Sequence, residues 1–189
     1  MIDQLIDYDK ELFLYLNNLG SETWDTLWLV ITNKLTFIPL YAILLFLLYK
    51  KFGAKPLLVF VIVVALMITF TDQITNVFKR GFERPRPCGA EGVKDLARMV
   101  AGYCGKYGFF SGHSSNSMAA AVFAGLALRS HYKNLIFILL FWSAIVAYSR
   151  IYVGVHYPLD IVCGMTFGAI SGFLFYKLSQ ILLRRFELA

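Results

Sequence analysis

The sequence has little charge and an excess of apolar residues. Only 16% of its 189 residues are Asp, Glu, Lys or Arg, whereas 58% are hydrophobic. This balance excludes an ordinary soluble domain. A helix that crosses a bilayer needs about 20 apolar residues, so the chain has room for one bundle of several spanning helices and no clear second domain. We therefore expect a single membrane-embedded domain over residues 1–189.

Features of several other protein classes are also missing. There is no low-complexity tract and no convincing internal repeat, and Asp3, Asp7 and Asp9 stand where a cleavable signal peptide would have basic residues. We expect the first span to act as an uncleaved insertion signal. The net charge of +6 does not indicate a nucleic-acid partner, because the basic residues fall between apolar runs. Membrane topology and anionic headgroups explain that placement better. The oligomeric state is left open.

The apolar runs predict an all-α membrane bundle of about five spanning helices. The expected spans are Leu27 to Tyr49, Leu57 to Phe78, Ser111 to Leu128, Leu135 to Tyr148 and Leu159 to Leu183. Asn33 and Lys34 interrupt the first of these, so a shorter span from about Leu35 is the alternative. Before it, Ile2 to Leu16 has apolar residues at helical spacing with acids between them. This pattern favours an amphipathic helix in the membrane interface or an ordinary helix packed on the bundle.

Basic residues are concentrated in the turns that follow the first, third and fifth spans, where Glu187 is the only acid. They are Lys50, Lys51, Lys55, Arg129, Lys133, Lys177, Arg184 and Arg185. The positive-inside rule places these turns and the C-terminus in the cytoplasm. The expected location is a bacterial inner membrane, with the loop 81–110 facing the periplasm or exterior. That loop is basic as well, an exception that an anion-binding site would explain.

Three polar clusters fall on this outer side, two at the ends of the loop 81–110 and one between the fourth and fifth spans. They are Lys79 with Arg86-Pro87, then Ser111-Gly112-His113, and finally the stretch Ser149 to Asp160, which contains Arg150 and His156. No local sequence constraint forces three separate segments to carry cations and imidazoles on one side. Converging cations with two imidazoles indicate a site for an oxyanion, and for phosphate in particular.

Five of these residues are candidates for holding the phosphate. Lys79, Arg86 and Arg150 can donate charge-assisted hydrogen bonds to its oxygens and stabilise the charge that develops in transfer. Ser111 and Gly112 stand at the start of a helix, where free backbone N–H groups and the helix dipole favour an anion. Gly112 also lets the backbone approach closely.

The two histidines are candidates for the chemistry itself. Asp160 lies four residues after His156, the spacing at which a carboxylate can fix the tautomer of an imidazole on the same helix face. We therefore assign His156 as the nucleophile, Asp160 as the residue that orients it, and His113 as the general acid.

Taken singly, these residues have ordinary explanations. A histidine at the end of a span is more often an interfacial polar residue, Arg150 alone could snorkel to the surface, and Ser111 could be a plain N-cap. Arg80 and Arg84 are left as headgroup contacts. Only the joint pattern on one side of the membrane favours a site.

The spacing of the clusters also resembles a known family. Lys79, six residues and Arg86-Pro87; Ser111-Gly112-His113; and Ser149-Arg150, five residues, His156, three residues, Asp160 together resemble the three-part signature of the type 2 phosphatidic acid phosphatase / vanadium haloperoxidase superfamily. The resemblance covers residues 79–160 and implies a phosphohistidine on His156, protonation of the leaving group by His113 and no metal requirement. One departure is Phe110, where the family often has proline.

Neither a metal nor another cofactor is expected, because His113 and His156 are surrounded by Lys and Arg. Only three cysteines are present. Cys163 is expected to pack inside the fifth span, whereas Cys88 and Cys104 share the outer loop as a disulfide or as two free thiols. Gly164, Gly168 and Gly172 repeat every four residues and predict a tight helix-packing stripe.

The sequence thus predicts an integral-membrane phosphatase that removes a terminal phosphate from a lipid phosphate or pyrophosphate. Undecaprenyl pyrophosphate, phosphatidylglycerol phosphate, phosphatidate and lipid A phosphates all present such a group, and we favour undecaprenyl pyrophosphate or a broad specificity. One alternative, a vanadate-dependent haloperoxidase, is disfavoured by the membrane architecture. The other, a non-catalytic lipid-phosphate binding or transport protein, would not need the paired histidines and Asp160.

Overall fold

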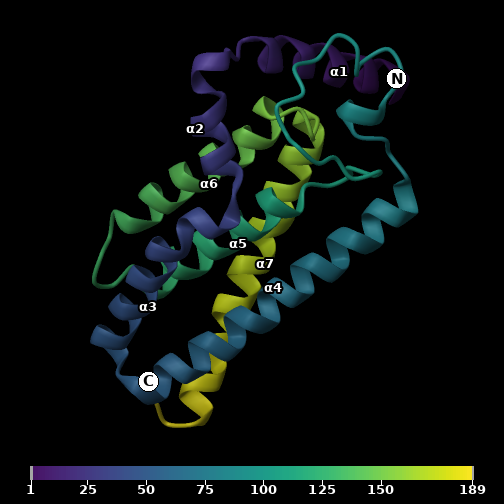
Figure 1. Ribbon diagram of the computed structural model, residues 1–189. Coiled ribbons are helices and arrows are strands. Elements are labelled where there is room, and N and C mark those ends of the chain that lie inside the picture. The colour runs from purple at the N-terminus through teal and green to yellow at the C-terminus, as the bar shows by residue number, and fades with distance from the viewer. Residues whose placement is uncertain (1, 189) are drawn as a thin grey trace.

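The computed structural model describes residues 2–188, and within them the chain folds into seven α-helices and two short 3-10 helices (Figure 1). In chain order these are α1 (Ile2–Asn18), α2 (Glu22–Thr32), η1 (Lys34–Phe37), α3 (Ile38–Phe52), α4 (Ala54–Phe82), η2 (Pro87–Gly89), α5 (Gly112–Ala127), α6 (Leu135–Tyr152) and α7 (Pro158–Arg185). One isolated antiparallel bridge joins Pro85 to Tyr107. The expected all-α bundle is confirmed.

Four helical segments are long and apolar enough to cross a membrane: Lys34–Phe52, Ala54–Phe82, Leu135–Tyr152 and Pro158–Arg185. The first begins at Lys34, because the chain breaks after α2 and starts a new helix. The side chain of Asn33 accepts a hydrogen bond from the backbone nitrogen of Leu35 at 3.0 Å, which caps that new start. Of the two predicted first spans, the structure therefore has the shorter one.

The remaining predicted span is α5, which is short and enclosed. Its 16 residues extend about 24 Å, less than the hydrocarbon core of about 30 Å. Its Ser, Ala and Gly residues allow it to pack tightly between α6 and α7. The predicted glycine stripe on α7 faces it: a Cβ at Gly164 would lie 2.7 Å from the carbonyl oxygen of Ser111, and one at Gly172 2.5 Å from that of Ala119.

The helices from α3 to α7 alternate in direction, so successive turns lie at opposite ends of the bundle (Figure 1). The α5–α6 turn lies beside the end of α3, since the rings of His131 and Phe52 are 5.9 Å apart. Lys51 Nζ lies 5.6 Å from the ring of Tyr132. Leu183 near the end of α7 belongs to the same buried cluster as Leu48. The basic turns therefore share one end, as the sequence pattern predicts.

Helix α1 lies across the other end (Figure 1). Its inward face buries Asp9, Phe13 and Asn17, and the ring of Phe13 packs edge-on against Tyr157 at 5.3 Å. The side chain of Asn17 donates to the carbonyl oxygen of Tyr152 at 2.9 Å. Apolar residues remain exposed on another face, among them Leu5, Tyr8, Leu12 and Tyr15. Helix α1 is thus packed on the bundle, which was one of the two predictions for this segment. It also keeps the amphipathic pattern on which the other prediction was based.

Candidate active site

One cavity of about 710 Å³ brings all three motifs together. The motif residues that line it are Lys79, Arg86, Gly112, His113, Arg150 and His156. Helices α3 and α4 contribute a mostly apolar part of its wall, for example Leu44, Leu48, Val64 and Ile68. Residues separated by up to 77 positions, from Lys79 to His156, thus face one space.

His156 and Asp160 form a buried pair behind this cavity. His156 Nδ1 lies 3.2 Å from Asp160 Oδ2, and Asp160 Oδ2 also accepts a hydrogen bond from the backbone nitrogen of Tyr157 at 3.1 Å. The pairing places the ring proton on Nδ1 and leaves the Nε2 lone pair available. Burial lowers the pKa of His156 to about 4, against the opposing effect of Asp160. The imidazole is therefore neutral near pH 7.

The turn between α6 and α7 fixes this geometry. Gly154 has φ of 85°, a left-handed conformation that other residues adopt only with strain, and it ends α6 just before His156. Pro158 then occupies the first turn of α7, where its missing N–H has no cost. Asp160 lies within that first turn and bonds back to the backbone of Tyr157, so the start of α7 and the orientation of His156 are determined together.

Ser111 and Gly112 take different places at the start of α5. Ser111 is fully buried. Its hydroxyl accepts two hydrogen bonds from Ser114, one from the backbone nitrogen at 3.3 Å and one from the side-chain hydroxyl at 2.9 Å. Ser111 does not line the cavity. Its hydroxyl caps the start of α5 beside the site. A Cβ at Gly112 would lie 3.7 Å from Lys79 Nζ, so the bare backbone faces that cation.

Of the four cations that line the cavity, three belong to the motifs: Lys79, Arg86 and Arg150. No ion pair between described residues involves Lys79, Arg86 or Arg150. Arg86 is held by a 2.9 Å hydrogen bond from Nε to the carbonyl oxygen of Tyr107, and burial lowers its pKa. Arg150 Nη1 donates to Thr32 Oγ1 at 2.5 Å, while its Nε is buried and has no partner among residues 2–188. Such a group of half-buried cations is a site for an anion.

Arg84 is where the sequence-based assignment is wrong. It was expected to contact headgroups, but its side chain is only 16% exposed. Nη1 donates to Asp160 Oδ1 at 2.8 Å, and Nη2 donates to Asp9 Oδ2 at 2.6 Å. Its guanidinium carbon also lies 4.3 Å from the centre of the Tyr157 ring. Pro85 separates two arginines that look alike in sequence, and nothing in their spacing tells which one points inward.

Gly108 and Thr32 also belong to the site and carry no sequence signal. A Cβ at Gly108 would lie 3.1 Å from Asp160 Oδ2 and 3.2 Å from Arg86 Cγ, so only glycine fits without a shift. Thr32, at the end of α2, is the hydrogen-bond partner of Arg150. Both residues meet the motifs only through the tertiary fold.

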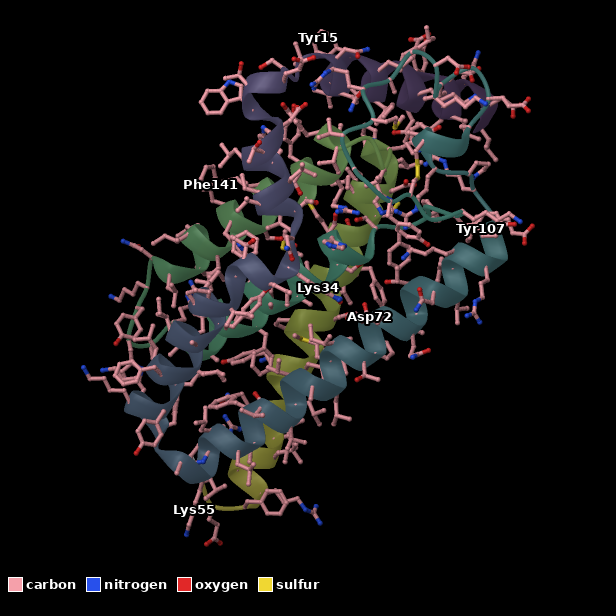
Figure 2. All side chains as sticks on the ribbon, in the orientation of Figure 1. Tyr15, Lys34, Lys55, Asp72, Tyr107 and Phe141 are labelled. Carbon is pink, nitrogen blue, oxygen red and sulfur yellow. A yellow bond between two sulfur atoms is a disulfide. The ribbon has the colours of Figure 1, made fainter. Side chains whose placement is uncertain are left out.

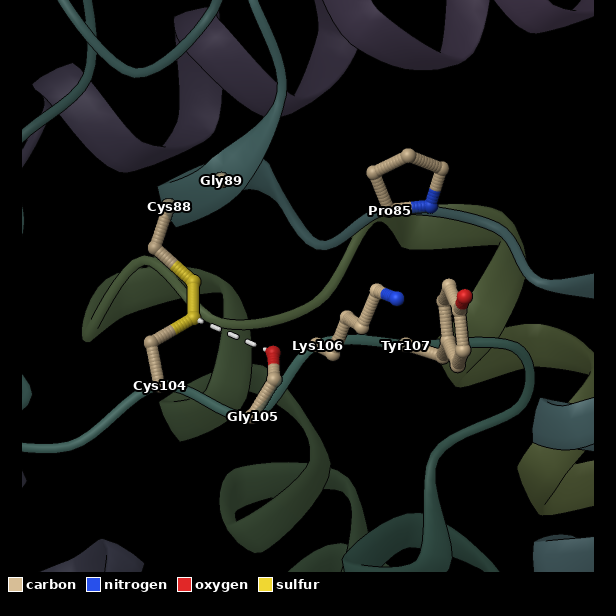
Figure 3. Close-up of a pocket in the computed structure, with 7 residues that line it drawn as sticks. All are labelled: Pro85, Cys88, Gly89, Cys104, Gly105, Lys106 and Tyr107. Atoms are coloured by element: carbon tan, nitrogen blue, oxygen red, sulfur yellow. Dashed lines mark hydrogen bonds between the residues drawn. A yellow bond between two sulfur atoms is a disulfide. The ribbon is translucent and has the colours of Figure 1, made fainter.

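The outer loop is tied together beside Arg86. Cys88 and Cys104 form a disulfide with their Cα atoms 6.4 Å apart, and a pocket of about 290 Å³ lies next to it (Figure 3). The backbone nitrogen of Arg86 donates to the carbonyl oxygen of Lys106 at 3.4 Å. The disulfide therefore links the segment that carries Arg86 to the segment whose carbonyl groups hold it.

A second polar group also lines the cavity. Lys34 and Asp72 both face it (Figure 2). Asn116 donates to Asp72 Oδ1 at 2.8 Å and accepts from Thr71 at 2.5 Å. Sequence reasoning did not select these residues. Within residues 2–188, no three His, Cys, Asp or Glu side chains cluster as metal ligands would.

Comparisons with known proteins agree with this geometry. The PAP2 superfamily model matches residues 55–184. The lipid A 4'-phosphatase of Bacteroides thetaiotaomicron is 37% identical over 190 residues, which cover 99% of this chain and 84% of that protein. The lipid A 4'-phosphatase of Porphyromonas gingivalis is 35% identical over 180 residues, 93% of this chain and 75% of that protein.

A solved structure has the same fold. The crystal structure of Aquifex aeolicus LpxE superposes with a TM-score of 0.66 at 27% identity, over 88% of this chain and 93% of that one. The matched family region contains both histidines of the cavity together with Lys79, Arg86 and Arg150, and the relatives are phosphatases of lipids. The chain therefore belongs to the PAP2 superfamily and is an integral-membrane lipid phosphatase.

Proposed function

We propose that this phosphatase hydrolyses the 4'-phosphate of lipid A and forms a phosphohistidine on His156. The observation that carries the mechanism is the set of three cations, Lys79, Arg86 and Arg150, that line the cavity with both histidines and have no carboxylate partner among the described residues. The names of two relatives that align with most of this chain support the substrate. This proposal replaces the undecaprenyl pyrophosphate that the sequence alone favours.

In the first step, Nε2 of neutral His156 attacks phosphorus and the bond from phosphorus to the sugar oxygen breaks. The negative charge of the bound phosphate favours the protonated form of His113. His113 gives its proton to that leaving oxygen, so the dephosphorylated lipid departs as an alcohol. Attack leaves positive charge on the imidazole ring. The carboxylate of Asp160, 3.2 Å from Nδ1, stabilises that charge and keeps the ring oriented.

In the second step, water attacks the phosphohistidine and gives a proton to His113, which is now neutral. The phosphorus–nitrogen bond breaks, its electron pair returns to Nε2, and inorganic phosphate is released. Lys79, Arg86 and Arg150 hold the phosphate oxygens in both steps through charge-assisted hydrogen bonds, which are stronger in a partly buried site than in bulk water. His113 is protonated again and the enzyme returns to its starting state.

The wall of the cavity supports a substrate with a large polar headgroup and apolar chains. The apolar residues of α3 and α4 suit acyl chains. Lys34, Asp72 and Asn116 add donors and acceptors that can meet the hydroxyl and amide groups of an acylated sugar. A prenyl pyrophosphate has no groups in its chain that could use them.

We also propose an orientation. The end of the bundle that carries the basic turns lies in the cytoplasm by the positive-inside rule, and the active site faces the periplasm. The Cys88–Cys104 disulfide lies on the active-site side and supports this assignment, because disulfides persist in oxidising compartments.

A panel of lipids in detergent tests the substrate. Purified enzyme is given lipid A, undecaprenyl pyrophosphate, phosphatidylglycerol phosphate and phosphatidate, and released phosphate is measured. We expect the highest kcat/KM for lipid A, with mass spectrometry showing loss of the 4'-phosphate. A higher kcat/KM for any other lipid would overturn the substrate, and loss of the 1-phosphate would overturn the position.

A further inference from the structure

We infer that Asp9 in α1 is a positioning residue for the reaction, acting on His156 through Arg84 and Asp160. This inference rests on the proposed roles of His156 and Asp160. It gives the N-terminal helix a part in catalysis, although α1 lies outside residues 79–160 and contributes no atom to the lining of the cavity.

The contacts form one continuous chain across three segments. Asp9 Oδ2 accepts from Arg84 Nη2 at 2.6 Å, Arg84 Nη1 donates to Asp160 Oδ1 at 2.8 Å, and Asp160 Oδ2 lies 3.2 Å from His156 Nδ1. Asp9 Oδ1 accepts from the backbone nitrogen of Leu159 at 2.8 Å. Asp9 therefore fixes both the arginine that holds Asp160 and the backbone residue that precedes Asp160.

The two carboxylates of this chain of contacts are buried, which makes their hydrogen bonds costly to break. Asp9 is 7% exposed and Asp160 is fully buried, so neither carboxylate can exchange its partner for water at low cost. A buried acid on the inward face of α1 is expensive where an apolar side chain would pack. Its cost is offset only by the two hydrogen bonds that it accepts, and both lead to the first turn of α7.

The charges explain why a second carboxylate is useful. One guanidinium lies between two carboxylates, so Arg84 does not neutralise Asp160 alone. Without the charge of Asp9, the positive charge of Arg84 would act on Asp160 uncompensated and would oppose the charge that forms on His156 during attack. Asp9 thus preserves the ability of Asp160 to stabilise that charge while Arg84 keeps Asp160 in place.

The main test is Asp9→Asn, alone and combined with Asp160→Asn. Asparagine keeps the size and one acceptor but removes the charge. We expect kcat on the preferred lipid phosphate to fall about tenfold with little change in KM, as for residues that orient catalytic groups. In the Asp160→Asn background, Asp9→Asn should cost less than about twofold, because the two residues act as a unit.

Asp25→Asn is the matched control. Asp25 accepts from Arg98 at 2.9 Å and thereby holds α2 to the outer loop, but it does not contact the His156 pair. This variant should lower the melting temperature without lowering kcat. If Asp9→Asn also lowers only the melting temperature, or lowers kcat equally in the presence and absence of Asp160, the positioning role is wrong.

Arg84→Lys provides an independent test if Asp9→Asn does not fold. Lysine keeps the charge but lacks the planar fork that reaches two carboxylates, so kcat should again fall about tenfold at unchanged KM. Full kcat in this variant would overturn the inference. Full activity of Asp160→Asn would instead overturn the proposed mechanism, which separates the two failures.

Discussion

His156 Nδ1 lies 3.2 Å from Asp160 Oδ2, and both side chains are buried at the start of α7. The carboxylate can therefore stabilise positive charge on the ring with little screening by water. We expect Asp160→Asn to lower kcat about a hundredfold, similar to the loss of one preorganised group that stabilises a transition state. Steady-state phosphate release measures this, and a KM close to that of the unmodified enzyme would show that binding is intact.

The histidines themselves give the plainest test of the mechanism. His156→Ala removes the nucleophile and His113→Ala removes the general acid, so each should abolish measurable phosphate release. Size-exclusion chromatography in detergent checks that both variants insert and fold. Full turnover by either one would exclude the assigned role. His131→Ala is the control, because His131 lies in the α5–α6 turn at the far end of the bundle.

The low pKa of His156 predicts how stability depends on pH. Burial lowers that pKa to about 4 in the folded protein, whereas an exposed histidine has a pKa of about 6.5. Between these values the unfolded chain binds more protons than the folded one, so stability is complete above about pH 6.5 and declines toward pH 4. The melting temperature should therefore fall between pH 7.5 and 5.

Replacing His156 by Asn should reduce that fall. Differential scanning fluorimetry in detergent measures both proteins. Equal pH dependence in the unmodified protein and the His156 variant would contradict a neutral, buried imidazole.

Gly108 predicts the effect of a single added methyl group. In Gly108→Ala the new Cβ would lie 3.1 Å from Asp160 Oδ2 and 3.2 Å from Arg86 Cγ. One of these groups must move, and we expect kcat/KM to fall about tenfold or more. Gly102→Ala is a matched control in the same loop, because its Cβ would have no heavy atom within 4 Å. Equal activity of the two variants would exclude this close contact.

The disulfide predicts a dependence of phosphate binding on the outer loop. Cys88 and Cys104 are 16 positions apart, and a crosslink over that distance contributes about 3 kcal/mol. Replacing both by serine should lower the melting temperature and raise KM several-fold, since Arg86 lies two residues before Cys88. Cys163→Ser is the control for loss of a thiol in the bundle. An unchanged KM would show that the loop holds Arg86 without the crosslink.

Much of the fold could be predicted from the sequence because it follows from local patterns. The length of the apolar runs predicted four of the spans, and the polar pair Asn33-Lys34 marked the start of the first one. Helix α5 was also identified, but a run of small residues does not reveal that it is shorter than a bilayer and enclosed by other helices. Its enclosure depends on the close approach of Gly164 and Gly172, which is a property of the pair of helices.

The site was predictable where chemistry requires particular residue types at fixed spacing. Lys79, Arg86, His113, Arg150 and His156 line one cavity, although their roles remain proposals. The contributions of Asp9 and Gly108 could not be predicted, because one is 151 positions from Asp160 and the other has no side chain. Arg84 was misassigned for the same reason: its partners come from both ends of the chain.

The backbone nitrogen of Ser111 donates to the carbonyl oxygen of Asp160 at 3.0 Å, so the start of α5 is joined directly to the start of α7. The two histidines are thereby set at a fixed separation by main-chain atoms that no substitution of a side chain removes. Among the described residues, the opposite wall, built from α3 and α4, has no such main-chain link to either histidine. Substitutions in that wall can therefore reshape this part of the cavity while the two histidines keep their spacing.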